Sequence, residues 1–196
     1  AVSTGGNIVT SGDTIDFTNA LTLTESVLLD TGAGADISFT NTGTIDDGAG
    51  GPWNLTVDAP GSVISFGAAS GAGNGRIGGA AGANRIGTLT VTDAGTVNFN
   101  GEVFATVLTQ TAGSVITTSN QAVNISGNIS ISGTAVTINN GVTTTAGGTV
   151  TITNTGALTI AATGDMSLDG LFLQTGGGAV STGGNIVTSG DTIDFT

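Results

Sequence analysis

Carboxylates are the groups in this sequence that could do chemistry. Fourteen Asp and Glu residues stand against two Arg residues, and the sequence contains neither His nor Cys. It can therefore form no Ser/His/Asp or Cys/His nucleophile system and no Cys/His zinc site. Two close pairs, Asp13 with Asp16 and Asp46 with Asp47, are the candidates for a glycosidase, which needs two carboxylates at a set distance across a sugar.

Aromatic residues are scarce, which weighs against a sugar-cleaving enzyme. The sequence has seven Phe and one Trp, and most Phe residues fall at the inward positions of an alternating pattern. Polysaccharide lyases and hydrolases place converging charged groups and aromatic rings in an open cleft. Function must be argued from a site, and the sequence shows no clear set of residues for such a cleft. We therefore expect no enzymatic activity, and a polysaccharide-active enzyme is the remote alternative.

One short segment resembles a calcium-binding motif. Thr31–Asp36 reads TGAGAD, which is similar to a single copy of the GGxGxD nonapeptide of calcium-binding β-rolls. The segment lacks the first Gly, is not repeated in tandem, and places Ile37 where the roll would have an outward residue. We expect no cofactor and no specific metal site; Asp36 is the candidate ligand for weakly bound Ca²⁺, and solvated acids are the alternative.

A Gly/Ala-rich stretch, Gly67–Asn84, interrupts the regular pattern; it contains the basic residue Arg76 and is followed directly by the other, Arg85. One interpretation is an insertion or side loop of a repeating fold. The other is a binding loop, because loops on rigid scaffolds often carry recognition. The candidate binding residues are Asn74, Arg76 and Arg85.

The net charge of −12 excludes one class of partner. Nucleic acid is held mainly by Lys and Arg, and two arginines cannot form a basic track. The charge instead predicts a solvated surface that repels other copies. No segment has the length and hydrophobicity of a membrane span, so we expect no membrane insertion by these residues, and any targeting signal lies outside them.

The elements that would position these residues are short β-strands. Apolar residues alternate with polar ones in segments such as Ile15–Phe17, Ile37–Phe39 and Val150–Ile152, and each segment ends at Gly, Asn or Asp. A period of two with β-branched residues and turn formers at both ends predicts strands. No window has helical periodicity, so we expect almost no helix.

The spacing of these segments selects the fold. Comparable apolar positions recur at Ile15 and Ile37. The same step separates Val136 from Leu158, and nearly the same step separates Val115 from Val136. Such spacing predicts an all-β, parallel β-solenoid with about 20–22 residues per coil, whose coils stack at roughly 4.8 Å. Tandem β-sandwiches are the alternative, although they usually carry longer strands and more aromatic residues.

The sequence also repeats itself without change. Residues 1–18 return as residues 179–196, so Ala179 is the equivalent of Ala1. We interpret residues 1–178 as one solenoid period, with 67–84 as its insertion, and residues 179–196 as the start of the next period. Such identity indicates a recent tandem array, so we expect a longer protein of stacked repeats.

The cadence of Leu55–Phe66 and Gly87–Phe99 resembles that of giant repetitive bacterial surface proteins, the filamentous-haemagglutinin-like and autotransporter-like adhesins. The resemblance implies a right-handed parallel β-helix, secretion across the outer membrane, and a role in attachment, biofilm or a surface sheath. It carries over no ligand residue. We therefore expect a structural segment of an extracellular filament or stalk that associates with itself end to end. The alternative is an adhesin that binds a glycan or a neighbouring cell surface.

Overall fold

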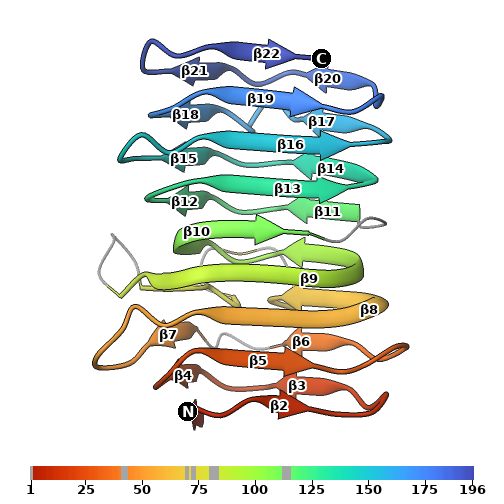
Figure 1. The fold of residues 1–196 in the computed structure, drawn as a ribbon, viewed down its shortest axis with the longest axis vertical. Helices are drawn as coiled ribbons and strands as arrows, with labels where there is room; N and C mark the ends of the chain where they lie inside the picture. Colours follow the sequence, from red (N-terminus) through yellow and green to blue (C-terminus); the bar gives the residue numbers. More distant parts are fainter. Residues whose placement is uncertain (1, 41–43, 69–70, 72–73, 80–83, 112–115) are drawn as a thin grey trace.

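The chain climbs as a right-handed parallel β-solenoid of about eight coils (Figure 1). The computed structural model describes residues 2–40, 44–68, 71, 74–79, 84–111 and 116–196, and these residues contain strands and turns but no helix. In Figure 1 the strands in front run to the right, and the chain returns behind them to the left as it rises from the N-terminus. The predicted solenoid is confirmed, and tandem sandwiches are excluded because the strand pairings are parallel and link one coil to the next.

Three faces make up each coil. The first face holds the start of β10 (Val103–Gln110) together with β1 (Val2–Thr4), β4 (Leu21–Leu23), β7 (Ile45–Asp47), β12 (Val123–Ile125), β15 (Val142–Thr144), β18 (Met166–Leu168) and β21 (Ile186–Thr188). The second face holds the starts of β8 (Leu55–Phe66) and β9 (Ile86–Phe99), the end of β10, and β2 (Ile8–Val9), β5 (Val27–Asp30), β13 (Ile129–Gly133), β16 (Val150–Asn154), β19 (Phe172–Thr175) and β22 (Ile193–Phe195). The third face holds the ends of β8 and β9, and β3 (Ile15–Phe17), β6 (Ile37–Phe39), β11 (Ile116–Ser119), β14 (Ala135–Ile138), β17 (Leu158–Ile160) and β20 (Val180–Thr182).

Alternation explains why these strands form. Successive side chains of a strand point to opposite sides of the sheet, so every second side chain points into the interior of the solenoid. In β3 and β17 the outer residues of each triplet are buried and the central one is exposed. Each inward residue then stacks on the inward residue of the next coil, and these vertical columns form one continuous hydrophobic core.

The register confirms most of the predicted spacing and corrects one step. Ile15 pairs with Ile37, and Val136 pairs with Leu158, as the predicted spacing requires. On its other side, Val136 pairs with Thr117. Val115, which the apolar pattern selected as that partner, lies outside the described residues. The sequence pattern missed Thr117 because it is a buried polar residue at an inward position.

The lower part of one third-face column consists of phenylalanines. Phe17, Phe39, Phe66 and Phe99 occupy equivalent positions in four successive coils, with ring centroids 5.1, 5.3 and 5.3 Å apart. Parallel in-register pairing places equivalent side chains about 4.8 Å apart, which suits stacked rings. The next residue in this column is Ser119, and there the aromatic stack ends.

The Gly/Ala-rich stretch contributes to the core as well as to the surface. Ile77 is fully buried and forms bridges to Ile45 below and Val103 above, so it supplies the first face of its coil. Gly75 has a φ of 61°, and a Cβ there would lie 2.1 Å from the backbone nitrogen of Gly67. This position therefore requires glycine, because the chain turns in a left-handed conformation against its own backbone.

Candidate functional site

An open hollow of about 430 Å³ lies where the loop after β7 faces the beginning of β9. Residues from three levels of the solenoid line it: Asp47, the loop Gly48–Pro52, Asn84, Arg85 and Thr106. These residues are far apart in sequence, and only the stacking of coils brings them together. The hollow is the candidate binding site of the described part of the chain, because a carboxylate (Asp47), a guanidinium (Arg85) and the backbone of the loop Gly48–Pro52 all face it and could contact a ligand.

Arg85 connects this hollow to the coils above it. Its Nη1 donates hydrogen bonds to the carbonyl oxygens of Ala105, at 3.2 Å, and of Asn124. Its guanidinium carbon lies 5.8 Å from the centre of the Phe104 ring, within cation–π range. Burial lowers the pKa of Arg85, but an arginine stays protonated at neutral pH. The side chain therefore holds successive coils together and places a fixed positive charge at the hollow.

Asp47 shapes the opposite wall. Its Oδ1 accepts a hydrogen bond of 3.0 Å from the backbone nitrogen of Trp53. The carboxylate lies so close to Gly51 that a Cβ there would come within 1.8 Å of Oδ2. The Trp53 ring packs against the core, and its indole Nε1 is buried without a hydrogen-bond partner in the described structure. Asp47 thus fixes the loop, and the hollow offers one carboxylate and one guanidinium.

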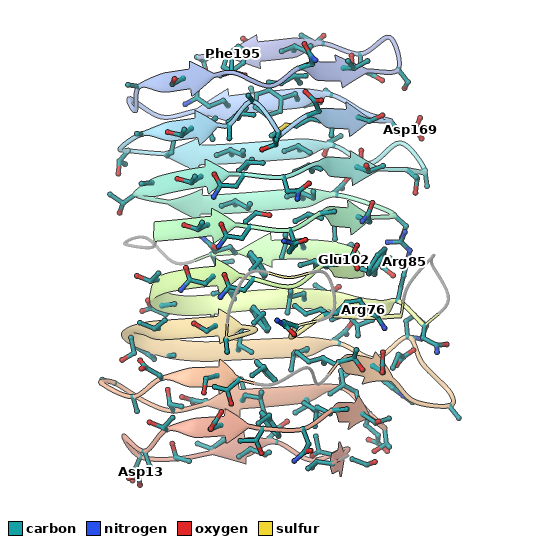
Figure 2. All side chains as sticks on the ribbon, turned by 180° about the vertical axis from the view of Figure 1, so that it is seen from behind. Asp13, Arg76, Arg85, Glu102, Asp169 and Phe195 are labelled. Atoms are coloured by element: carbon teal, nitrogen blue, oxygen red, sulfur yellow. The ribbon has the colours of Figure 1, made fainter. Side chains whose placement is uncertain are left out.

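The three residues of the predicted binding loop do not meet in one site. Figure 2 shows Arg76 and Arg85 near the middle of the solenoid, between Asp13 at one end and Phe195 at the other. Arg76 is half-buried, and its Nε donates a 3.1 Å hydrogen bond to the carbonyl of Gly78. Asn74 is also half-buried, and neither it nor Arg76 lines the hollow, whereas Arg85 does.

The candidate metal ligand Asp36, and Asp16 of one carboxylate pair, are hydrogen-bonded to the neighbouring coil. Asp36 accepts a hydrogen bond of 2.8 Å from the backbone nitrogen of Val63. Asp16 accepts hydrogen bonds from the hydroxyls of Ser38 and Thr40, at 2.8 and 3.0 Å. Within the described residues, no group of three or more acidic side chains is placed to hold a metal ion.

An acidic column that the sequence pattern did not reveal runs along the second face. Asp30 and Asp58 are partners in register, and Asp93 lies near them in the next coil. Desolvation raises the pKa of Asp58, and the charges of Asp30 and Asp93 raise it further. Its Oδ1 is buried without a hydrogen-bond partner in the described structure. The sequence alone does not reveal this column, because the three acids become neighbours only once the strand register is known.

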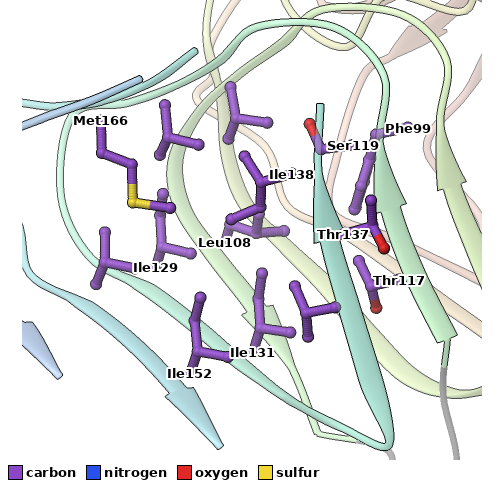
Figure 3. Close-up of a pocket in the computed structure, with 14 residues that line it drawn as sticks. Phe99, Leu108, Thr117, Ser119, Ile129, Ile131, Thr137, Ile138, Ile152 and Met166 are labelled. Carbon is purple, nitrogen blue, oxygen red and sulfur yellow. The ribbon is translucent and has the colours of Figure 1, made fainter. Parts of the chain in front are cut away.

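A small cavity inside the solenoid is a packing feature. It has a volume of about 20 Å³ and lies where Ser119 follows Phe99 in its column (Figure 3). Figure 3 shows Leu108, Ile131 and Met166 among the side chains around it. Such a volume accommodates about one water molecule and no larger ligand. The change from a large ring to a small hydroxyl side chain explains the space.

The chain matches no protein-family model, no curated protein and no solved structure. Among the residues that the structure describes, there is no helix with the length and hydrophobicity needed to cross a membrane. Functional conclusions therefore depend on the geometry of the solenoid and its hollow.

Proposed function

We propose that this chain is a structural segment of a long extracellular bacterial surface filament or stalk, which associates with itself through stacked coils. The observation that carries the proposal is an unbroken ladder: the first-face column is paired step by step from Val2 to Ile186. Because each coil rests on its neighbours, length grows with the number of repeats. The resemblance to bacterial adhesins supports the extracellular location.

The proposed role is mechanical and includes no catalysis. Backbone hydrogen bonds between coils run along the axis, so a pulling force is shared among the three faces. Burial of the inward columns stabilises the stack by about 25 cal/mol per Å² of apolar surface. The net charge of −12 keeps neighbouring filaments apart while leaving the ends free to stack.

The last coil presents an apolar end. Val180, Ile193 and Phe195 are 37%, 41% and 44% exposed, although all three lie at inward positions of their columns. Unpaired strand edges with apolar side chains are templates for further pairing. We therefore expect chains that end at this coil to associate end to end as their concentration rises.

Electron microscopy and sedimentation velocity over a range of concentrations test the proposal. The expected result is rods that lengthen with concentration. Ile193→Asp places a charge at the inward edge and should abolish the lengthening, whereas Val187→Asp, at an exposed outward position of the same coil, should not. Separate beads, or a species that stays monomeric with both variants behaving alike, would contradict the filament role.

The hollow beside Arg85 favours a second candidate, an adhesin that binds a glycan or a cell-surface partner. Deleting Gly67–Asn84 is a poor test, because it would remove Ile77 from the core. Ala49→Trp instead fills the hollow from an exposed loop position. If the hollow binds glycans, this variant loses binding on a glycan array, while Ala162→Trp in an exposed turn elsewhere keeps it. Equal binding by both variants would remove the hollow as the site.

A further inference from the structure

Residues 1–18 and 179–196 have the same sequence, and each copy forms three strands. Equivalent strands of the two copies nevertheless lie on different faces of the solenoid. The first-face column that starts at Val2 passes through eight pairings and reaches Ile186. In the repeated sequence, Ile186 is the equivalent of Ile8, which belongs to the second face. The second copy is therefore displaced by one face relative to the first.

The other two columns show the same displacement. The third-face column that starts at Ile15 ends at Val180, the equivalent of Val2 from the first face. The second-face column that starts at Ile8 ends at Phe195, in the strand equivalent to β3 of the third face. All three strands of the copy agree, so the displacement belongs to the whole coil.

Both copies nevertheless adopt the same local structure. The Thr4 hydroxyl donates to the carbonyl of Gly6 at 2.8 Å, and its equivalent Thr182 donates to Gly184 at 2.7 Å. The conformation of the coil is thus set by its own sequence, and its face is set by how many coils precede it.

The two copies show the lower and upper contacts of one and the same coil. Asn7 accepts a hydrogen bond of 2.9 Å from the backbone nitrogen of Leu28 in the coil above. Its equivalent Asn185 donates from Nδ2 to Asp165 in the coil below, at 3.2 Å. One amide side chain can make both bonds, because its oxygen accepts and its nitrogen donates.

The aromatic contacts are compatible in the same way. Phe17 stacks on Phe39 above it, with centroids 5.1 Å apart. Its equivalent Phe195 lies 5.3 Å from Phe172 below it. Where one period follows another, the residue at this position has an aromatic neighbour both above and below. A further copy of the coil that stacks on residues 1–18 can therefore stack on residues 179–196 in the same way.

From these observations we infer that consecutive periods, each equivalent to residues 1–178, are rotated by one third of a turn about the filament axis. Eight coils separate Val2 from Ile186. Ile186 is the equivalent of Ile8, which follows Val2 by one face, or one third of a coil. A period is therefore one third of a coil shorter than eight coils and contains 7⅔ coils. Three periods contain 23 whole coils, and only then does a feature return to the same edge. The hollow beside Arg85 is consequently displayed on three edges in turn, which gives the filament a threefold set of identical sites. This inference rests on the proposed filament.

A chain of three periods tests the rotation. It is made by appending residues 19–196 twice to the present chain, with Ala49→Cys in each period; the native sequence has no Cys, so thiol labelling with gold or nitroxide is specific. Viewed down the axis, the three gold labels should occupy three different edges. Between adjacent periods, the nitroxide distance should exceed the axial rise of about 37 Å that 7⅔ coils give.

The control pair lies within one period. Ala49 and Thr145 both follow strands of the first face, β7 and β15, which are four coils apart. Cysteines at these two positions should therefore mark one edge, at an axial rise of about 19 Å. Rods whose three Ala49→Cys labels fall on a single edge would overturn the rotation and leave the filament role standing. Separate lobes in place of a rod would overturn both.

Discussion

The lower and upper parts of the solenoid fill the same columns with different chemistry. From Phe17 to Phe99 one third-face column is a stack of buried aromatic rings. Its continuation above holds Ser119 and then Ile138. A neighbouring second-face column changes in a similar way, from Val91 to the buried Gln110.

This difference shows what the coil geometry requires. In-register stacking accepts any side chain that satisfies its neighbours above and below, whether by ring contact or by hydrogen bond. Gln110 is 2% exposed, and its Oε1 accepts a 2.8 Å hydrogen bond from Thr117, while its Nε2 donates to the carbonyl of Ser132 at 3.1 Å. In the columns that hold Gln110 and Thr117, the upper part thus replaces the aliphatic residues Val91 and Val97 with a buried polar pair, whose stability depends on both partners.

Removing one ring from the lower part should have the largest effect. Phe66 is fully buried between two stacked rings, so Phe66→Ala should lower the free energy of unfolding by about 3–5 kcal/mol. Phe195→Ala, at a position that is 44% exposed, should cost clearly less. Urea unfolding followed by circular dichroism measures both. Equal losses would show that the ring stack contributes nothing beyond the presence of an aromatic side chain.

Breaking the buried polar pair should come next. Thr117→Val keeps the shape of the side chain but leaves the Gln110 oxygen without its donor, at a cost of about 1–3 kcal/mol. The double variant Thr117→Val/Gln110→Leu should recover most of that loss, because the column neighbours Val91 and Ile131 are apolar. A double-mutant cycle in urea measures the coupling. Additive losses would mean that the two side chains act independently.

The contrast also shows where sequence reasoning succeeds. Alternation in segments such as Ile15–Phe17 identifies the fold, because the period of two and the coil length are local properties. The pattern fails at Thr117 and Gln110, since polar residues at inward positions break the apolar signal although their hydrogen bonds satisfy them. It also fails at Ile77, whose glycine-rich surroundings conceal a core position.

The candidate site was predictable only in part. The sequence predicts Arg85 as a candidate, because a basic residue directly after a glycine-rich stretch is unusual in an acidic chain. Asp47 and Thr106 join it from other coils, and no local pattern connects them to Arg85. Their proximity depends on the lengths of the intervening coils, which are set by turns and insertions whose sizes the alternation does not specify.

Outward columns allow a gentler test of the same comparison. In the upper part, Asn120 donates to Asn100 and accepts from Asn139, each at 2.8 Å, which forms an amide ladder along one corner. Asn120→Ala removes both bonds and should cost about 1–2 kcal/mol. Asn19→Ala removes an exposed side chain whose side-chain hydrogen bond within the described residues is the 3.3 Å bond to Thr18, and it should be nearly neutral. Thermal unfolding of the two variants measures the difference, and equal melting temperatures would show that the ladder is not stabilising.

The acidic column of the lower part, Asp30, Asp58 and Asp93, gives the smallest and most pH-dependent effect. Because the pKa of Asp58 is raised in the folded chain, the contribution of this residue to stability is complete below its unfolded value of 3.8 and is lost as the pH rises through its folded pKa. Asp58→Asn should remove that loss and raise the urea midpoint at neutral pH. Asp93→Asn should do so in part, because Asp93 supplies the smaller of the two coulombic contributions. Since Asp58 is only partly buried, added salt should weaken the coulombic part of the effect. Unfolding midpoints of both chains measured from about pH 3 to about pH 7 test this assignment. An Asp58→Asn variant with the same pH dependence as the native chain would contradict it.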